Sequence, residues 1–140
     1  MNRKFAKVCT VAAVFALAWT MPARAATQIT LAGTQFVPAV SSITLGDTIT
    51  WTNSEPADYP VVIGKHNIIP DPDTAALLGF RPFPTSSKLL GLGQSWSCTG
   101  STTGAKCVGA NGKTVTLTRG NYTFKCGLHP NQMRGILVIA

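Results

Sequence analysis

The sequence predicts an all-β protein, a β-sandwich of about eight strands interrupted by one long, partly helical insertion. Short runs in which apolar and polar residues alternate lead to this prediction, because alternation is the period of a half-buried strand. Glycine, asparagine, aspartate and serine separate several of these runs, as turns between strands require. The chain has no internal repeat and no low-complexity tail, so the strands are expected to form one domain.

The segments around Gly46 and Asp47 show the strand pattern best, because these two residues supply a turn between two alternating runs. The apolar residues expected to face the core there are Ile43, Leu45, Ile49 and Trp51. The expected strands are residues 28–31, 35–37, 42–45, 48–52, 66–69, 94–98, 114–117, 121–126 and 135–139.

Residues 70–93 break the strand pattern and are predicted to contain a short helix. Asp71 can cap its N-terminus, Pro72 suits the first helical position and Gly79 suits the exit. The remaining apolar residues of this insertion are Leu77, Leu78, Phe80, Phe83, Leu89, Leu90 and Leu92. The insertion either packs as a lid over one end of the sandwich or stays partly exposed as a docking surface.

Residues 1–25 have the pattern of a secretory signal peptide. Basic residues near the start precede an apolar stretch at residues 8–19, and Ala23, Arg24 and Ala25 form a small-residue cleavage site. An uncleaved anchor is the alternative, but the apolar stretch is too short for a comfortable membrane span, so no stable membrane insertion is expected. Export to the periplasm would leave a domain at 26–140, long enough for one core.

The formal net charge of +7 belongs partly to the leader. Without Arg3, Lys4, Lys7 and Arg24, eight basic residues remain against five acidic ones, which leaves a charge of +3. The eight basic residues are scattered, so no nucleic-acid-binding patch is expected. This charge supports only a mild preference for an acidic partner.

Three cysteines remain after the leader: Cys98, Cys107 and Cys126. An exported chain with an odd number of cysteines has one thiol to be explained. Cys98 and Cys107 flank a loop rich in glycine, serine and threonine at 99–106, which suits a local disulfide across a hairpin. In the alternative, Cys126 pairs with one of the other two cysteines and its thiol is not available to a metal.

The stretch from Cys126 to Met133 contains three potential metal donors within eight residues. A thiolate from Cys126, an imidazole from His129 and a thioether from Met133 lie between two strand-like runs, and a second imidazole, His66, lies upstream. Two histidines, one cysteine and one weakly bound methionine are the donor set of a blue-copper electron-transfer site. We therefore expect these four residues to bind one copper ion, with Asn67 placed to support the loop around Cys126.

At these residues the sequence resembles the cupredoxins, the small blue copper proteins. The resemblance covers most of the chain after the leader, in the motifs Phe36-x-Pro38, Ile43-x-Leu45-Gly46-Asp47-Thr48-Ile49-x-Trp51-x-Asn53, His66-Asn67, Tyr122-x-Phe124-x-Cys126-x-x-His129-Pro130 and Met133-x-Gly135. It implies a Greek-key sandwich with copper near one end, and ligand roles for His66, Cys126, His129 and Met133. Three residues separate His129 from Met133, whereas amicyanin-like loops have two and plastocyanin-like loops four. Lys65 stands where the group usually has proline, and the subfamily stays open.

The resemblance implies a periplasmic one-electron carrier with a mononuclear type 1 copper site rather than an enzyme. We expect a monomer that docks transiently to redox partner proteins near His129, on the surface-facing turn of the loop. The alternative is a copper carrier or resistance protein that binds and delivers the ion. Such proteins often use open sites rich in methionine and histidine, and this chain has two histidines in all.

Overall fold

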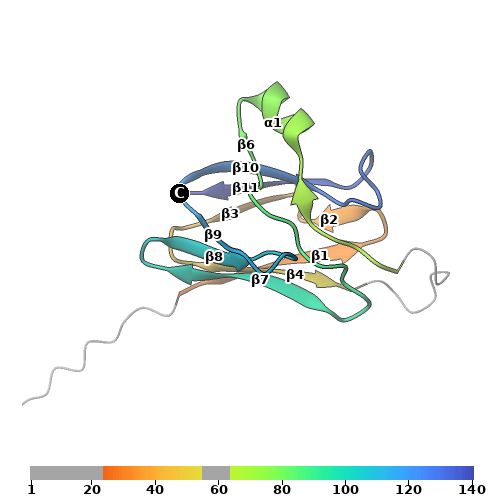
Figure 1. The fold of residues 1–140 in the computed structure, drawn as a ribbon, viewed down its shortest axis with the longest axis horizontal. Coiled ribbons are helices and arrows are strands. Elements are labelled where there is room, and N and C mark those ends of the chain that lie inside the picture. The colour runs from red at the N-terminus through yellow and green to blue at the C-terminus, as the bar shows by residue number, and fades with distance from the viewer. Residues whose placement is uncertain (1–23, 55–63) are drawn as a thin grey trace, which may run out of the picture.

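Two mixed β-sheets face each other in the computed structural model, which describes residues 24–54 and 64–140 (Figure 1). The predicted all-β sandwich is therefore confirmed. Between consecutive strands of the described residues the chain changes sheet five times, after β2, β3, β4, β6 and β9. Most of the predicted leader, residues 1–23, lies outside the described residues, so the signal peptide and the boundary at residue 26 remain predictions.

One sheet has six strands, in the spatial order β2-β1-β4-β7-β8-β9. These strands are β1 (Ala26–Ala32), β2 (Gln35–Val37), β4 (Thr48–Asn53), β7 (Ser95–Ser101), β8 (Gly104–Val108) and β9 (Thr114–Leu117). The pair β1 and β4 is parallel, and the other neighbours are antiparallel.

The other sheet has the order β3-β11-β10-β5, and β6 also pairs with β10. Its strands are β3 (Val40–Ile43), β5 (Ile69–Pro70), β6 (Arg81–Pro82), β10 (Gly120–Lys125) and β11 (Arg134–Ile139). Strands β10 and β11 form an antiparallel hairpin, so the loop between them leaves the sheet at the pair Lys125 and Arg134. This hairpin loop carries the motif from Cys126 to Met133.

The space between the sheets is filled by aromatic and branched aliphatic side chains. Phe124 packs edge-on against Phe36 and Trp51, with ring centroids 4.8 and 5.6 Å apart. Ile43, Ile49 and Trp51 are buried and Leu45 packs partly buried against them, which confirms the predicted inward face. Trp51 is fully buried, as is Phe124 two residues before Cys126, so the core reaches almost to the predicted metal loop.

Among the described residues there are eleven strands rather than about eight, and three of these are only two or three residues long: β2, β5 and β6. Strand β8 was not predicted, because its glycine, alanine and lysine residues lack strand propensity. It forms through pairing with β7 and β9. The strand predicted over 66–69 was only partly right, because His66 makes an isolated bridge and pairing resumes at Ile69.

The predicted disulfide between Cys98 and Cys107 is confirmed. The two residues are directly opposite each other on β7 and β8, with Cα atoms 4.3 Å apart, and both side chains are fully buried. This separation is that of a close cross-strand pair in an antiparallel ladder. The pairing leaves Cys126 as a buried free thiol.

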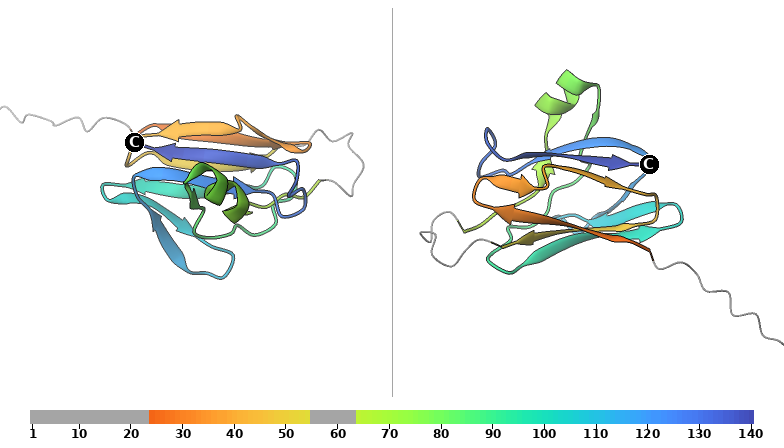
Figure 2. Two further views of the ribbon diagram at one scale, coloured as in Figure 1. Left: turned by 90° about the horizontal axis from the view of Figure 1, so that it is seen from above. Right: turned by 180° about the vertical axis from the view of Figure 1, so that it is seen from behind.

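The helix predicted in the insertion is confirmed as α1 (Pro72–Leu78). Asp71 caps it through the N–H of Thr74, and Gly79 ends it with φ of 68°, a left-handed conformation that glycine adopts without strain. Figure 2 shows α1 standing away from the two sheets. Phe83 and Leu90 of the insertion are buried, as a packed lid requires, while Leu77 is 84% exposed. A docking role for the exposed part stays a prediction.

The described residues include no helix that is long and apolar enough to span a membrane.

Candidate metal centre

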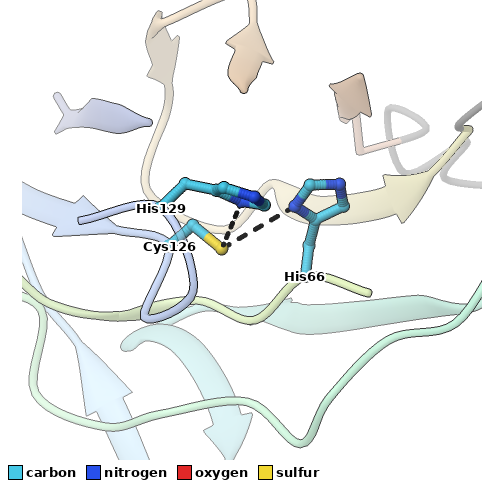
Figure 3. A group of neighbouring side chains, drawn as sticks. All are labelled: His66, Cys126 and His129. Atoms are coloured by element: carbon cyan, nitrogen blue, oxygen red, sulfur yellow. Dashed lines mark hydrogen bonds between the residues drawn. The ribbon is translucent and has the colours of Figure 1, made fainter. Parts of the chain in front are cut away.

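Three of the four predicted ligands converge at one end of the sandwich (Figure 3). The Cys126 sulfur lies 3.7 Å from Nδ1 of His66 and 3.7 Å from Nδ1 of His129. The two imidazole rings face the same space, with their centroids 5.3 Å apart. The nearest potential ligand atoms of the three residues all lie within 4.8 Å of one another.

These separations fit a metal ion bound between the three side chains. Metal–sulfur and metal–nitrogen bonds of roughly 2.3 and 2.0 Å, at an angle of about 120°, place sulfur and nitrogen about 3.7 Å apart. The two sulfur–nitrogen distances in the protein are both 3.7 Å. The geometry therefore suits a trigonal plane of two imidazoles and one thiolate, and this donor set suits one copper ion.

The hairpin loop positions Cys126 and His129 through backbone hydrogen bonds across its base. The N–H of Cys126 donates to the carbonyl of Met133 (2.9 Å), and the N–H groups of His129 and Met133 donate to the carbonyls of Cys126 and His129. The loop is thus a closed turn that returns Met133 beside Cys126. Met133 is fully buried, whereas His129 is half-buried and follows the exposed Leu128. The role of Met133 as a ligand stays a prediction.

His66 is held from the other side of the site by Leu90. The N–H of His66 donates to the carbonyl of Leu90 (3.1 Å), and the N–H of Leu90 donates back to the carbonyl of His66 (2.7 Å). The imidazole is fully buried. The end of the insertion therefore fixes the backbone of this predicted ligand. The sequence analysis did not anticipate this contact, because local patterns carry no information about pairing between distant segments.

Asn67 links the two halves of the site, as the sequence analysis expected. Its side-chain oxygen accepts a hydrogen bond from the N–H of Gly127 (2.8 Å) and lies 3.8 Å from the Cys126 sulfur. This contact ties the segment that carries His66 to the residue after Cys126. A hydrogen bond of this kind keeps a ligand loop in place before a metal binds.

The surroundings of Cys126 favour the thiolate that metal binding requires. Burial alone raises the pKa of a thiol. Hydrogen bonding to the His66 side chain, to the backbone N–H groups of Asn67 and Leu128 and to the His129 side chain outweighs burial and lowers the pKa of Cys126 from 9.0 to about 6. The site therefore favours the thiolate, the form that binds metals.

The sequence analysis assigned Asp71 only to the helix cap and missed its position near the metal loop. Asp71 is fully buried and forms ion pairs with Lys125 and Arg134, the residues on either side of the stretch from Cys126 to Met133. The cap motif in the sequence does not predict these ion pairs, because they join Asp71 to residues more than 50 positions away.

Solved structures with a similar fold include several copper proteins. A reduced amicyanin variant is 22% identical over 82% of both chains, with a TM-score of 0.51. A purple cupredoxin from Nitrosopumilus maritimus is 19% identical over 81% of this chain and 99% of its own, with a TM-score of 0.54. A copper-containing nitrite reductase from Thermus scotoductus SA-01 is 23% identical over 81% of this chain, with a TM-score of 0.55, but the match spans only 22% of that protein.

The chain matches no protein-family model and no curated protein sequence. Because the structural neighbours are less than 25% identical to this chain, the similarity establishes the fold. The protein has the cupredoxin fold, an all-β sandwich, and carries a His-Cys-His group beside the loop between β10 and β11.

Proposed function

We propose that the protein is a one-electron carrier that binds a single copper ion at a type 1 site. His66, Cys126 and His129 form the trigonal donor set, and Met133 is the weak axial ligand. The observation that carries this proposal is the convergence of one low-pKa thiol and two imidazoles at equal distances of 3.7 Å. A site of this composition stands between the geometries preferred by Cu(I) and Cu(II), so the bound ion supplies a one-electron couple that needs little rearrangement.

The protein's own residues hold that geometry. His66 and Cys126 are fully buried. Backbone hydrogen bonds with Leu90 fix His66, while the bond from Cys126 to Met133 and the one that Asn67 accepts from Gly127 fix the segment of Cys126. A buried and pre-formed donor set favours retention of the ion over its delivery to another protein. The alternative of a copper carrier therefore receives less support than electron transfer.

The residues available also argue against catalysis. Two histidines are present in the whole chain, and the site uses both, so no further imidazole exists for a second copper ion. Among the described cysteines, Cys126 is the single free thiol. With four donors from the protein, the site has no position reserved for a substrate. We infer a carrier rather than an enzyme.

Export to the periplasm and cleavage near residue 25 complete the proposal. The leader pattern in residues 1–25 supports export, and the disulfide between Cys98 and Cys107 suits an oxidising compartment. We expect the exported chain to be a monomer, because a mobile carrier must meet and leave its partners.

Transient docking is expected around His129. This ligand is half-buried, whereas His66 is fully buried, so His129 offers the shorter route to the surface. Leu128 beside it is 51% exposed. Redox encounters use small interfaces that release quickly, which suits a single exposed apolar side chain next to the ligand.

Titration of the metal-free protein with Cu(II) tests the copper site. We expect an intense visible band and the paramagnetic resonance spectrum of a thiolate–copper centre, and Cys126→Ser should lose both because a hydroxyl cannot supply the thiolate charge transfer. Replacement of both Cys98 and Cys107 by alanine is the matched control, since it removes two other sulfurs and should keep the colour. A folded Cys126→Ser protein that retained the wild-type spectrum would overturn the ligand assignment.

Kinetics separate electron transfer from copper delivery. Stopped-flow exchange of electrons with a small redox reagent should be much faster than loss of copper to an apo-acceptor or a chelator. Copper transfer as fast as electron exchange would favour the carrier alternative.

A further inference from the structure

One buried carboxylate lies at the base of the proposed metal loop without contacting any ligand. Asp71 is fully buried, and Nη1 of Arg134 donates to its two oxygens at 3.0 and 3.3 Å. Nζ of Lys125 lies 3.6 Å from Oδ1 of the same carboxylate. A buried charge is tolerated when charged partners and hydrogen bonds compensate for its lost hydration, and Asp71 has both.

The two cations occupy the positions that define the loop. Lys125 directly precedes Cys126, and Arg134 directly follows Met133. They are opposite each other in the β10–β11 ladder, at the last pair before the loop begins. One carboxylate therefore joins both ends of the loop and also offsets two positive charges that would otherwise face each other at its base.

The backbone of Asp71 ties a third segment to the same place. Its N–H donates to the carbonyl of Thr123 (3.3 Å), and the hydroxyl of Thr123 donates to the carbonyl of Asp71 (2.7 Å). The two residues before Asp71 form β5, which pairs with Phe124 and Lys125. Because His66 lies only five residues upstream of Asp71, this pairing sets the position of the buried ligand relative to the strand that ends at Cys126.

Helix α1 completes the cluster through Thr74. The Thr74 hydroxyl donates to Oδ2 of Asp71 (2.7 Å) and accepts from Nη1 of Arg134 (2.6 Å), and the Thr74 N–H donates to Oδ1 (3.3 Å). The helix cap and the ion pairs thus share one buried carboxylate, which lies at the base of the loop.

We propose that Asp71 is a positioning residue for the copper site, which holds both ends of the ligand loop and the segment carrying His66 in register. The proposal rests on the proposed function for its copper readouts. Loss of the carboxylate removes the ion pair of Arg134 and leaves Lys125 paired with the exposed Asp73, so the two cations repel each other and the base of the loop opens. The added positive charge also disfavours Cu(II) relative to Cu(I), which raises the reduction potential.

Asp73 provides a matched control for Asp71. Its side chain is 74% exposed and contacts Lys125 at 3.3 Å, so Asp73→Asn removes the same charge from the same neighbourhood. Water screens this exposed pair, and exposed pairs contribute little. Asp71→Asn should release copper to a chelator about tenfold faster than wild type, as is common when support for a ligand is lost. It should also raise the potential, while Asp73→Asn should leave both values close to wild type. Equal release rates and potentials in the two variants would overturn the proposal.

A metal-free measurement separates failure of this proposal from failure of the copper site. Amide hydrogen exchange at Cys126, His129 and Met133 in the metal-free protein should be faster in Asp71→Asn than in Asp73→Asn, because these N–H groups bond across the loop. Equal exchange would overturn the positioning role even in a protein that binds copper. If exchange is faster in Asp71→Asn than in Asp73→Asn, but the wild-type protein forms no coloured centre with copper, the positioning role is kept and the proposed function is refuted.

A second variant keeps the test decisive where Asp71→Asn does not fold. Arg134→Gln leaves the helix cap and the Lys125 ion pair in place and removes the guanidinium contacts to Asp71 and Thr74 at the end of the loop after Met133. Copper release several-fold faster than in Asp73→Asn supports the proposal, and release at the Asp73→Asn rate overturns it.

Discussion

Removal of the disulfide should weaken the protein without affecting its colour. The bond joins β7 to β8 across a separation of nine residues, and both sulfur atoms are buried. None of His66, Cys126 and His129 lies on these two strands. The informative variant replaces both Cys98 and Cys107 by alanine, which removes the cross-link and leaves no unpaired thiol in the hairpin.

The size of the effect follows from the closed loop. In the chain-entropy model, a cross-link across about nine residues stabilises the folded state by about 2.6 kcal/mol at 25 °C. For a domain of this length, each kcal/mol corresponds to about 4 °C in the midpoint of thermal unfolding, so the midpoint should fall by about 10 °C. The loss of two buried sulfur atoms adds to this value.

The assay is urea unfolding of the metal-free protein, followed by circular dichroism, so that copper binding does not contribute to stability. Wild-type protein with its disulfide chemically reduced is the control, because it keeps both sulfur atoms and loses only the cross-link. The difference between the reduced protein and the alanine variant then isolates the cost of the missing sulfur atoms.

Three results would refute the reasoning. A free energy of unfolding within about 0.5 kcal/mol of the wild-type value would show that the cross-link does not constrain the unfolded chain as the model assumes. Mass mapping that finds Cys126 in a disulfide in copper-loaded protein would contradict the pairing. Loss of the visible band in a folded alanine variant would show that the hairpin supports the site.

Three further predictions concern the metal loop and its surroundings. Leu128→Glu should slow electron exchange with a protein partner and leave the spectrum nearly unchanged, because it places charge on the expected apolar contact. Stopped-flow kinetics at several salt concentrations measure the exchange rate, and an unchanged rate would show that the partner docks at another surface. Asn67→Ala should lower copper affinity by roughly tenfold, since the loop loses a hydrogen bond that pre-forms it, and competition with a chelator measures the change. Acid should destabilise the metal-free protein through Asp71: burial raises the pKa of this carboxyl, but hydrogen bonds from the first turn of α1 and the charges of Arg134 and Lys125 lower it below 3.8. Because its pKa is lowered in the folded state, the ionised Asp71 carboxylate stabilises the fold above about pH 4, and this stabilisation is lost as the pH falls further. Wild type should therefore lose more free energy of unfolding than Asp71→Asn between about pH 5 and pH 2. Parallel pH profiles of the two proteins would contradict the assignment.

Local sequence was sufficient wherever a feature depends on neighbouring residues. The cap at Asp71, the first turn at Pro72 and the left-handed exit at Gly79 were all predicted and are all present. The spacing from Cys126 to His129 also determines a local geometry, because a tight turn after a strand brings both donors to one side. The disulfide was predictable for the same reason, since Cys98 and Cys107 flank a short hairpin.

Tertiary structure decided the features that join distant segments. Strand β8 has weak strand propensity and exists because β7 and β9 pair with it on either side. His66 lies 60 residues from Cys126, and only the packing of the two sheets, with the bridge to Leu90, brings its Nδ1 to 3.7 Å from the sulfur. The second role of Asp71 has the same origin. The sequence by itself determined which donors are available and how the loop turns. The fold alone determined that they meet, because contacts between distant segments depend on register and packing across the whole core, which local propensities do not encode.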